Sequence, residues 1–311
     1  MRPNGAIDVV IPVYNGAATI VDTLHQLLNL ADCTQADMRL IVCDDGSTDA
    51  TAMQLAEILD QRLTVVTLAQ NSGRSAACNA AVRAADASYL LILDADCRPS
   101  GAGYADALGE LIGRGIDLAY GPIQGDAEGF WKAYLAEVEA RRNRRALQGH
   151  HLQSMTTGNL LLRRDLFESA GGFSELYRYY GFEDKDLIAR LLSAGVKPVY
   201  ENLLSVTHEA GNTVAGYCAK MKDAGRYSAP VFAATHPQQY RSLAFARLDP
   251  DLYPKPLRPL LRVIGRIGAP PLRALATWAA GSWLPGQLQI RLVKLAAAFS
   301  YLHGAGLRST R

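Results

Sequence analysis

Residues 40–49, Leu40-Ile41-Val42-Cys43-Asp44-Asp45-Gly46-Ser47-Thr48-Asp49, join a short hydrophobic run to a cluster of carboxylates. A second run of this kind, residues 89–96, ends in Leu93-Asp94-Ala95-Asp96. Neighbouring parallel strands bring their carboxyl ends to one edge of a sheet, so both clusters are expected to line a single crevice. Such a crevice can hold a divalent cation and a polyphosphate ester. We therefore expect an enzyme that acts on a nucleotide-activated substrate.

Strand and helix patterns alternate along the first hundred residues. Hydrophobic runs with little alternation, typical of strands buried on both faces, lie at residues 7–13, 40–43, 63–68 and 89–93. Helical spacing of apolar residues is found between them, at residues 19–30, 50–61 and 75–85. This order predicts an α/β fold with a mostly parallel central sheet flanked by helices.

Composition places the chain among globular cytoplasmic proteins. Its 311 residues, 49% of them hydrophobic, can bury a full core. Five cysteines, an odd number without a Cys-x-x-Cys pair, favour reduced thiols over a disulfide framework. The residues before the first strand do not resemble a signal peptide, and no run of about 18 uncharged apolar residues predicts a membrane span. We expect a cytoplasmic protein, either free or attached to the inner face of the membrane.

Charge is concentrated in the C-terminal sixty residues. The net charge of the chain is only +2, but residues 252–311 hold nine basic residues and no acidic one. The nine are Lys255, Arg258, Arg262, Arg266, Arg273, Arg291, Lys294, Arg308 and Arg311. Leucine and isoleucine recur beside them at helical spacing, which predicts two basic amphipathic helices around residues 257–266 and 288–302. Six prolines between Pro254 and Pro285 predict that this region is divided into short helices.

Three interpretations of this basic region differ in what the arginines contact. The favoured one is in-plane attachment of residues 252–311 to an anionic membrane, because the charge is of one sign and Trp278 and Trp283 suit an interface. In the second, the apolar faces pack on the catalytic domain or on each other, and the arginines are solvated. Nucleic acid is not expected as a partner, because the basic residues are not interleaved with a recognised binding motif.

Six short motifs occur in an order known from one enzyme family. They are Ile11-Pro12-Val13-Tyr14-Asn15-Gly16, Asp44-Asp45-Gly46-Ser47-Thr48-Asp49, Asn71-Ser72-Gly73-Arg74, Asp94-Ala95-Asp96, Gly171-Gly172-Phe173 and Gly181-Phe182-Glu183-Asp184. With them the chain resembles glycosyltransferase family 2, inverting enzymes of GT-A fold. The resemblance implies a GT-A catalytic domain at residues 1–211, with a nucleotide-binding half at 1–97 and an acceptor half at 98–211. A helical, basic region at 212–311 follows.

The resemblance also implies a donor site for a nucleotide sugar. Its residues would be Pro12, Val13, Tyr14, Asp44, Asp45, Arg74, Asp94 and Asp96. In this interpretation Asp45 accepts a hydrogen bond from a uracil imide N–H, and Asp44 orients the loop. Arg74 reaches the base or the phosphates, and the end of the first strand flanks the nucleobase.

Metal binding and base catalysis complete the implied site. Alternate residues that leave a strand point to opposite sides, so one carboxylate of Asp94 and Asp96 can contact the ribose and the other the metal. The family implies that Asp96 is the firmer ligand of Mg²⁺ or Mn²⁺. His208 is either a second metal ligand, as in some family members, or a hydrogen-bonded structural residue. Asp184 matches the base that deprotonates the acceptor hydroxyl, and Glu183 is the second choice.

These expectations converge on a metal-dependent, inverting glycosyltransferase whose donor is a nucleotide sugar, most simply a UDP-sugar. The basic region favours a saccharide or lipid-linked acceptor. Candidates are a lipid, a lipid-linked sugar and an envelope glycan precursor. Two alternatives stay open: a soluble transferase with a structural tail, and a scaffold that binds nucleotide sugar without turnover. A nucleotidyltransferase would need a glycine-rich triphosphate loop with a basic signature near the N-terminus, which residues 11–16 do not supply.

Overall fold

The computed structural model describes residues 5–34, 36–209, 211 and 213–308. The chain folds into two compact units. The first comprises Met1–Asp126, Val138–Glu175 and Leu187–Ala210, and the second comprises Ala127–Glu137, Leu176–Asp186 and Gly211–Arg311. The second unit therefore gathers two internal segments together with the C-terminal residues.

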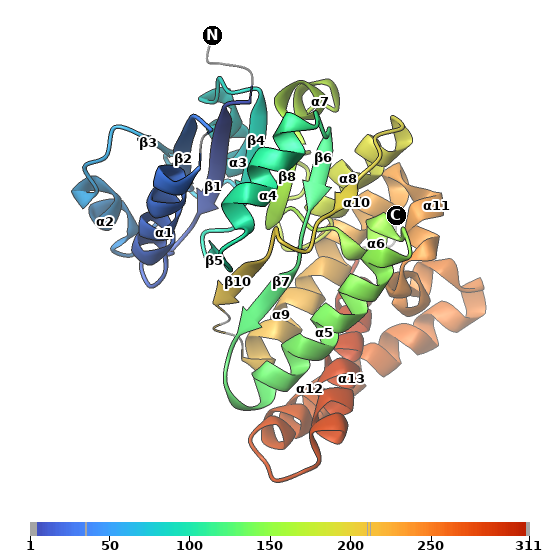
Figure 1. The fold of residues 1–311 in the computed structure, drawn as a ribbon. Helices are drawn as coiled ribbons and strands as arrows, with labels where there is room; N and C mark the ends of the chain where they lie inside the picture. Colours follow the sequence, from blue (N-terminus) through green and yellow to red (C-terminus); the bar gives the residue numbers. More distant parts are fainter. Residues whose placement is uncertain (1–4, 35, 210, 212, 309–311) are drawn as a thin grey trace. The chain divides into compact units, whose positions relative to one another are not determined.

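A seven-stranded sheet forms the centre of the first unit (Figure 1). Across the sheet its strands are β3 (Leu63–Thr67), β2 (Met38–Asp44), β1 (Ile7–Val13), β4 (Tyr89–Leu93), β8 (Asn159–Arg163), β6 (Leu118–Tyr120) and β9 (Val199–Tyr200). Neighbouring strands are parallel except where β8 pairs with β4 and β6. The predicted α/β class with a mostly parallel sheet is confirmed.

Helices connect the parallel strands in the predicted order. α1 (Ile20–Cys33) links β1 to β2, α2 (Thr51–Glu57) links β2 to β3, and α3 (Arg74–Arg83) links β3 to β4. Each helix begins within one residue of its predicted start, although α2 ends at Glu57, short of the predicted end at Gln61. The remaining helices that contribute residues to this unit are α4 (Tyr104–Gly113), α5 (Gly129–Leu147), α6 (His151–Ser154), α7 (Arg164–Ser169) and α8 (Glu183–Ser193).

The core of the first unit is built on β1 and β4, in which every residue is buried. Leu24 and Leu27 of α1 belong to the same hydrophobic cluster. β3 differs, because it pairs only with β2 at the edge of the sheet and its Val65 is exposed. The prediction that residues 63–68 are buried on both faces is therefore wrong. An edge strand lies at the margin of the helical layer, so its side chains are covered less completely.

A second, three-stranded sheet in the first unit consists of β5 (Cys97–Pro99), β10 (Val206–Glu209) and β7 (Ile123–Asp126), with β10 in the middle. β10 runs antiparallel to β5, and His208 is paired with Cys97. This register holds His208 beside the residue that follows Asp96.

The described residues of the second unit are largely helical. Its helices are α9 (Val214–Asp223), α10 (Ala229–Thr235), α11 (Pro237–Ser242), α12 (Arg258–Ala280) and α13 (Gly286–Gly306), with a π-helical turn at Ala224–Ser228. Short 3₁₀ turns lie at Ala244–Leu248, Pro250–Leu252 and Lys255–Leu257. α13 packs against both α9 and α12. A side chain at Gly304 would place its Cβ 1.9 Å from the carbonyl oxygen of Lys222, so α13 and α9 approach this closely only with glycine.

Pro270 and Pro271 lie inside α12 rather than at its end. The prediction that prolines divide the basic region into short helices is wrong here, because residues 258–280 form one helix. The two prolines deprive the carbonyls of Arg266 and Ile267 of their usual N–H partners. All four residues are exposed, so water can satisfy these carbonyls.

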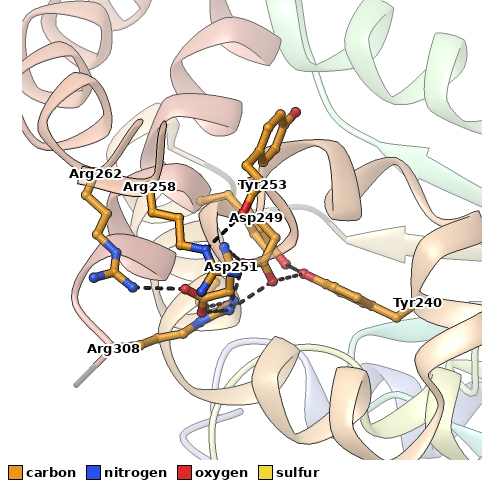
Figure 2. A network of polar contacts seen from close by, with 9 residues as sticks. Tyr240, Asp249, Asp251, Tyr253, Arg258, Arg262 and Arg308 are labelled. Carbon is orange, nitrogen blue, oxygen red and sulfur yellow. Dashed lines mark hydrogen bonds and ion pairs between the residues drawn. The ribbon is translucent and has the colours of Figure 1, made fainter. Parts of the chain in front are cut away.

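A polar network, buried around Asp249, joins the residues just before α12 to Arg308 just after α13 (Figure 2). Asp249 accepts a hydrogen bond from the Tyr240 hydroxyl at 2.7 Å and is paired with Arg308 Nη1 at 2.9 Å. Asp251 accepts from Arg308 at 3.2 Å and from Arg262 at 2.9 Å. Two arginines of the basic region are thus paired with carboxylates that directly precede it.

Other charges of the basic region are also used inside the second unit. Lys294 of α13 forms an ion pair with Glu137. Arg258 donates from Nε to the carbonyl of Tyr253 at 2.9 Å (Figure 2). Arg311 lies outside the described residues. Several basic side chains of this region therefore have partners within the second unit, which the sequence alone does not indicate.

Candidate active site

Asp45 follows β2 and fixes the loop that leads into α3. Its two carboxylate oxygens accept hydrogen bonds from the backbone N–H groups of Ser72 at 2.7 Å and Gly73 at 2.9 Å. Burial raises the pKa of Asp45, while these two donors act to lower it. Each oxygen keeps further acceptor capacity, so the predicted bond to a base N–H is compatible with this geometry.

The ends of β1 and β2 are held together beside Asp45. The Asp45 N–H donates to the carbonyl of Val13 at 2.8 Å, and Asp44 accepts from the backbone N–H of Ser47 at 2.9 Å. Pro12 and Val13 are buried at the end of β1, whereas Tyr14 is exposed. The residues predicted to flank the nucleobase therefore lie next to Asp45, which is predicted to accept a hydrogen bond from the base. The aromatic ring of Tyr14 is open to solvent.

Arg74 is the first residue of α3, and its guanidinium points to the second acidic cluster. Nε and Nη2 donate to Asp94 Oδ1 at 3.0 and 2.6 Å. Nη1 and Nη2 also donate to the hydroxyl and carbonyl of Thr157, at 2.8 and 3.1 Å. Arg74 thus orients Asp94. Its predicted contact with the donor itself stays a prediction.

Thr157 and Gly158 form the other wall around Asp94. The Asp94 N–H donates to the carbonyl of Gly158 at 3.3 Å. A Cβ at Gly158 would lie 2.5 Å from Asp94 Oδ2, so any side chain there displaces the carboxylate. Thr157 belongs to none of the six motifs, so sequence reasoning missed its contacts with Arg74.

Asp96 and His208 meet where β5 begins beside β10. His208 Nε2 lies 3.1 Å from Asp96 Oδ2, and the Asp96 carbonyl accepts from the N–H of Glu209 at 2.9 Å. Two ligands about 2.1 Å from one ion, at a right angle, lie about 3 Å apart. A carboxylate oxygen and an imidazole nitrogen at this spacing fit a divalent cation. The same spacing also fits a hydrogen bond, so both predicted roles of His208 agree with the geometry.

Oxygens of Asp94 and Asp96 and the sulfur of Cys97 lie within 4.8 Å of one another. Burial raises the pKa of the Cys97 thiol well above its usual range, and the two carboxylates raise it further. Mg²⁺ and Mn²⁺ prefer oxygen ligands to sulfur, so the carboxylates are the better ligands of this group. Within residues 5–209 of the first unit that the structure describes, Arg74, Asp94, Asp96 and His208 thus form one connected site.

The predicted base lies in the second unit, at the start of α8. Glu183 and Asp184 are its first two residues, and Asp184 accepts from the backbone N–H of Lys185 at 2.7 Å. The preceding Phe182 has φ of +72°, a conformation unusual for a residue with a side chain. Its ring packs against Phe232, with centroids 5.4 Å apart.

Two residues further along α8, Asp186 is buried and anchored to the C-terminal region. It accepts from His236 Nε2 at 2.9 Å and from the Tyr177 hydroxyl at 3.4 Å. Phe182 also packs on Phe245, with centroids 5.4 Å apart. The segment around Asp184 is therefore held by residues about fifty positions later in the chain, which no local pattern indicates.

Two family models match the chain. The model described as glycosyl transferase family 2 matches residues 8–171, more than half of the protein. The chain belongs to glycosyltransferase family 2. A second model, described as the N-terminal domain of galactosyltransferase, matches residues 147–217.

A curated relative of this family-2 protein is the UDP-Glc:α-D-GlcNAc-diphosphoundecaprenol β-1,3-glucosyltransferase WfgD of Escherichia coli. The two are 31% identical over 90 residues, which are 29% of this chain and 34% of the relative. The chain matches about a third to a half of the length of the first curated relatives.

Solved structures share the fold of this family-2 protein. TarS of S. aureus, residues 1–349 in complex with UDP, aligns with a TM-score of 0.56 and 15% identity over 96% of this chain and 90% of that one. The mannosyltransferase PcManGT of Pyrobaculum calidifontis, in complex with GDP-Man and Mn²⁺, aligns with a TM-score of 0.58 and 20% identity over 98% and 86%. The predicted GT-A fold is confirmed by these likenesses.

Proposed function

We propose that the protein is a metal-dependent, inverting glycosyltransferase that transfers a sugar from a UDP-sugar to an acceptor hydroxyl. The observation that carries the proposal is the connected site of Arg74, Asp94, Asp96 and His208 in a chain whose residues 8–171 match glycosyltransferase family 2. UDP is the preferred nucleotide because WfgD is a UDP-Glc enzyme by name and TarS binds UDP.

The donor would lie at the carboxyl ends of β1, β2 and β4. Asp45 would accept from the uracil N–H, and the exposed ring of Tyr14 would flank the base. Arg74 would set the position of Asp94, which in turn would contact the ribose. This assignment keeps the predicted roles of these residues and gives Arg74 a positioning task in addition to any contact with the donor.

A divalent cation is expected as the cofactor, since PcManGT binds Mn²⁺ together with GDP-Man. Asp96 and His208 would hold Mg²⁺ or Mn²⁺, with Asp94 nearby. When bound, the ion neutralises the charge that grows on the departing nucleoside diphosphate.

Asp184 is proposed as the general base, with Glu183 as the second choice. Asp184 would take the proton from the acceptor hydroxyl while that oxygen forms its bond to the anomeric carbon. The bond from this carbon to the UDP oxygen breaks on the opposite face, so the anomer is inverted. Asp184 is the second residue of α8, so its carboxylate lies at the amino end of that helix.

The acceptor is proposed to be a lipid, a lipid-linked sugar or an envelope glycan precursor. WfgD, by its name, acts on a sugar linked to diphosphoundecaprenol. Residues 252–311 would bring the enzyme to the inner face of a membrane, where such acceptors lie. We retain residues 1–211 as the proposed catalytic domain, with donor and acceptor halves divided near residue 97, and 212–311 as its C-terminal extension.

The first experiment is thermal unfolding with UDP, GDP, dTDP and CMP, each with and without Mn²⁺. A ligand that binds the native state raises the midpoint by mass action. We expect a rise with UDP that requires Mn²⁺. If no nucleotide raises the midpoint, the protein is not a nucleotide-sugar enzyme of the proposed kind.

A second experiment tests the base. The Asp184→Asn variant should bind UDP and Mn²⁺ like the parent protein but lose transfer by at least a hundredfold. Transfer is measured with UDP-glucose, UDP-galactose and UDP-N-acetylglucosamine on a polyprenyl-diphosphate-linked N-acetylglucosamine. Near-normal transfer by Asp184→Asn would overturn the assignment and direct attention to Glu183.

A further inference from the structure

One side of α12 is apolar and exposed along most of the helix. Large apolar side chains and one proline recur there at steps of three and four residues, which is the repeat of a single helical face. They are Leu260, Ile264, Ile267, Pro271, Leu275 and Trp278, and Trp283 follows in the turn before α13. We call these seven residues the outer face of α12. At 1.5 Å per residue the stripe is about 27 Å long.

The opposite side of α12 is the one that packs inside the second unit. Gly265, Ala269, Ala276 and Ala279 are buried there. A Cβ at Gly265 would lie 2.8 Å from Leu302 of α13, which shows how closely the two helices approach. The outer face is therefore not needed to hold α12 in place, yet it carries the larger apolar side chains.

α13 does not share this property, although the sequence predicts both helices to be amphipathic in the same way. Its Val293, Ala297, Tyr301 and Leu302 are buried in the second unit. Its Lys294 is engaged with Glu137. Of the two predicted basic amphipathic helices, only α12 presents a continuous apolar face to solvent.

Two cationic side chains lie on the exposed surface of α12 beyond one margin of the outer face. Arg266 and Arg273 are exposed, lie two helical turns apart and fall on the same side of the stripe. Neither forms an ion pair with another residue in the described part of the chain, unlike Arg262 and Arg308. Residues 252–308 contain no carboxylate side chain.

We propose that the outer face of α12 docks in the plane of an anionic membrane surface. The apolar stripe would enter the boundary between headgroups and acyl chains, and Arg266 and Arg273 would contact the lipid phosphates. Trp278 and Trp283, 58% and 88% exposed, have the ring chemistry that is enriched at this boundary. Within the described residues, every helix is too short or too polar to cross a bilayer. Attachment through α12 is therefore peripheral.

The charge argues for a membrane over a second copy of this chain. A two-fold contact between two α12 outer faces would offer Arg266 and Arg273 no carboxylate of residues 252–308 as a partner. Anionic lipid phosphates supply the missing opposite charge.

This inference deepens the proposed function, because a lipid-linked acceptor would lie in the membrane to which α12 docks. The two can fail independently. Docking is measured with vesicles and no substrate, and the donor site with UDP and Mn²⁺ and no lipid.

The test is flotation of the full chain with vesicles of phosphatidylcholine alone or mixed with phosphatidylglycerol. We expect binding to the anionic vesicles only. The double variant Ile267→Glu and Trp278→Glu should reduce this binding by more than tenfold. Leu59→Glu is the matched control, because Leu59 is 94% exposed and lies outside α12.

A second pair of variants isolates the charge. Arg266→Gln with Arg273→Gln should weaken binding to anionic vesicles about 25-fold, at about fivefold per residue. Arg241→Gln with Arg247→Gln removes the same charge from exposed positions elsewhere in the second unit and should change binding far less.

Three results would overturn the proposal. The first is parent protein that does not float with anionic vesicles although UDP and Mn²⁺ still raise its unfolding midpoint. The second is equal loss in the α12 variants and their controls. The third is a concentration-dependent dimer, seen by sedimentation, that Ile267→Glu abolishes, since a second copy would then cover the face.

Discussion

Replacing Asp249 by alanine should destabilise the second unit by about 3 kcal/mol. Asp249 and Arg308 are 2% and 10% exposed in their side chains, so solvent screens their pairing little. Removing one partner of a buried ion pair costs about 3–5 kcal/mol. Arg308 keeps its hydrogen bonds to the carbonyl of Gly225, at 2.8 and 2.6 Å, and its contact with Asp251. The lower end of the range therefore applies.

Tryptophan fluorescence reports this change selectively. The three tryptophans of the chain, Trp131, Trp278 and Trp283, belong to the second unit. A loss of 3 kcal/mol, with a denaturant slope of about 2 kcal/mol per M, moves the urea midpoint down by about 1.5 M. The slope itself should be unchanged, because the same surface unfolds.

Two companion variants test the reasoning. Asp251→Ala breaks a pair whose carboxylate is 38% exposed, so it should cost about 1 kcal/mol or less. Adding Arg308→Met to Asp249→Ala should recover part of the loss, because the unpaired charge is gone. If Asp249→Ala shifts the midpoint no further than Asp251→Ala, the buried network does not hold the C-terminal region as described.

Other outcomes follow from single contacts. Gly158→Ala should weaken the Mn²⁺-dependent binding of UDP at least tenfold in calorimetric titration, because the new Cβ would lie 2.5 Å from Asp94 Oδ2. Phe182→Ala should lower the urea midpoint by an amount that corresponds to about 3 kcal/mol, since the buried ring packs in an aromatic cluster. Iodoacetamide at pH 8 should modify Cys33, which is exposed, and leave Cys43 intact by mass spectrometry. Burial and two nearby carboxylates raise the pKa of Cys43 to about 11, so about one thiol in a thousand is ionised at that pH.

The central sheet was predictable because its information is local. β1 and β4 are buried on both faces, so an unbroken hydrophobic run is enough to identify each. β3 has the same kind of sequence but lies at the edge of the sheet. Its position depends on strand order, which a single run does not encode.

Contacts between residues far apart in the sequence were harder to predict. Asp96 and His208 were both singled out, but their 3.1 Å contact depends on the pairing of β5 with β10. The bond between Asp186 and His236 depends likewise on a contact inside the second unit between residues fifty positions apart. Neither pairing leaves a periodic pattern in the sequence.

The charge of the C-terminal region shows a different limitation. A count of charged residues that begins at residue 252 finds only basic ones. Asp249 and Asp251 lie just before that boundary and form ion pairs with Arg308 and Arg262. Net charge over a segment measures neither pairing nor exposure. The structure separates the arginines that hold the fold from Arg266, which faces solvent.

The two acidic clusters of the sequence are physically joined through the loop before α3. Asp45 binds the N–H groups of Ser72 and Gly73, and Gly73 has φ of +92° at the start of the helix. Arg74, the next residue, then holds Asp94. A substitution of Asp45 can therefore displace Asp94 through this backbone segment, even without direct contact between the two residues. Substitutions in the proposed base-binding loop should alter metal dependence as well as nucleotide affinity, because one backbone segment supports both.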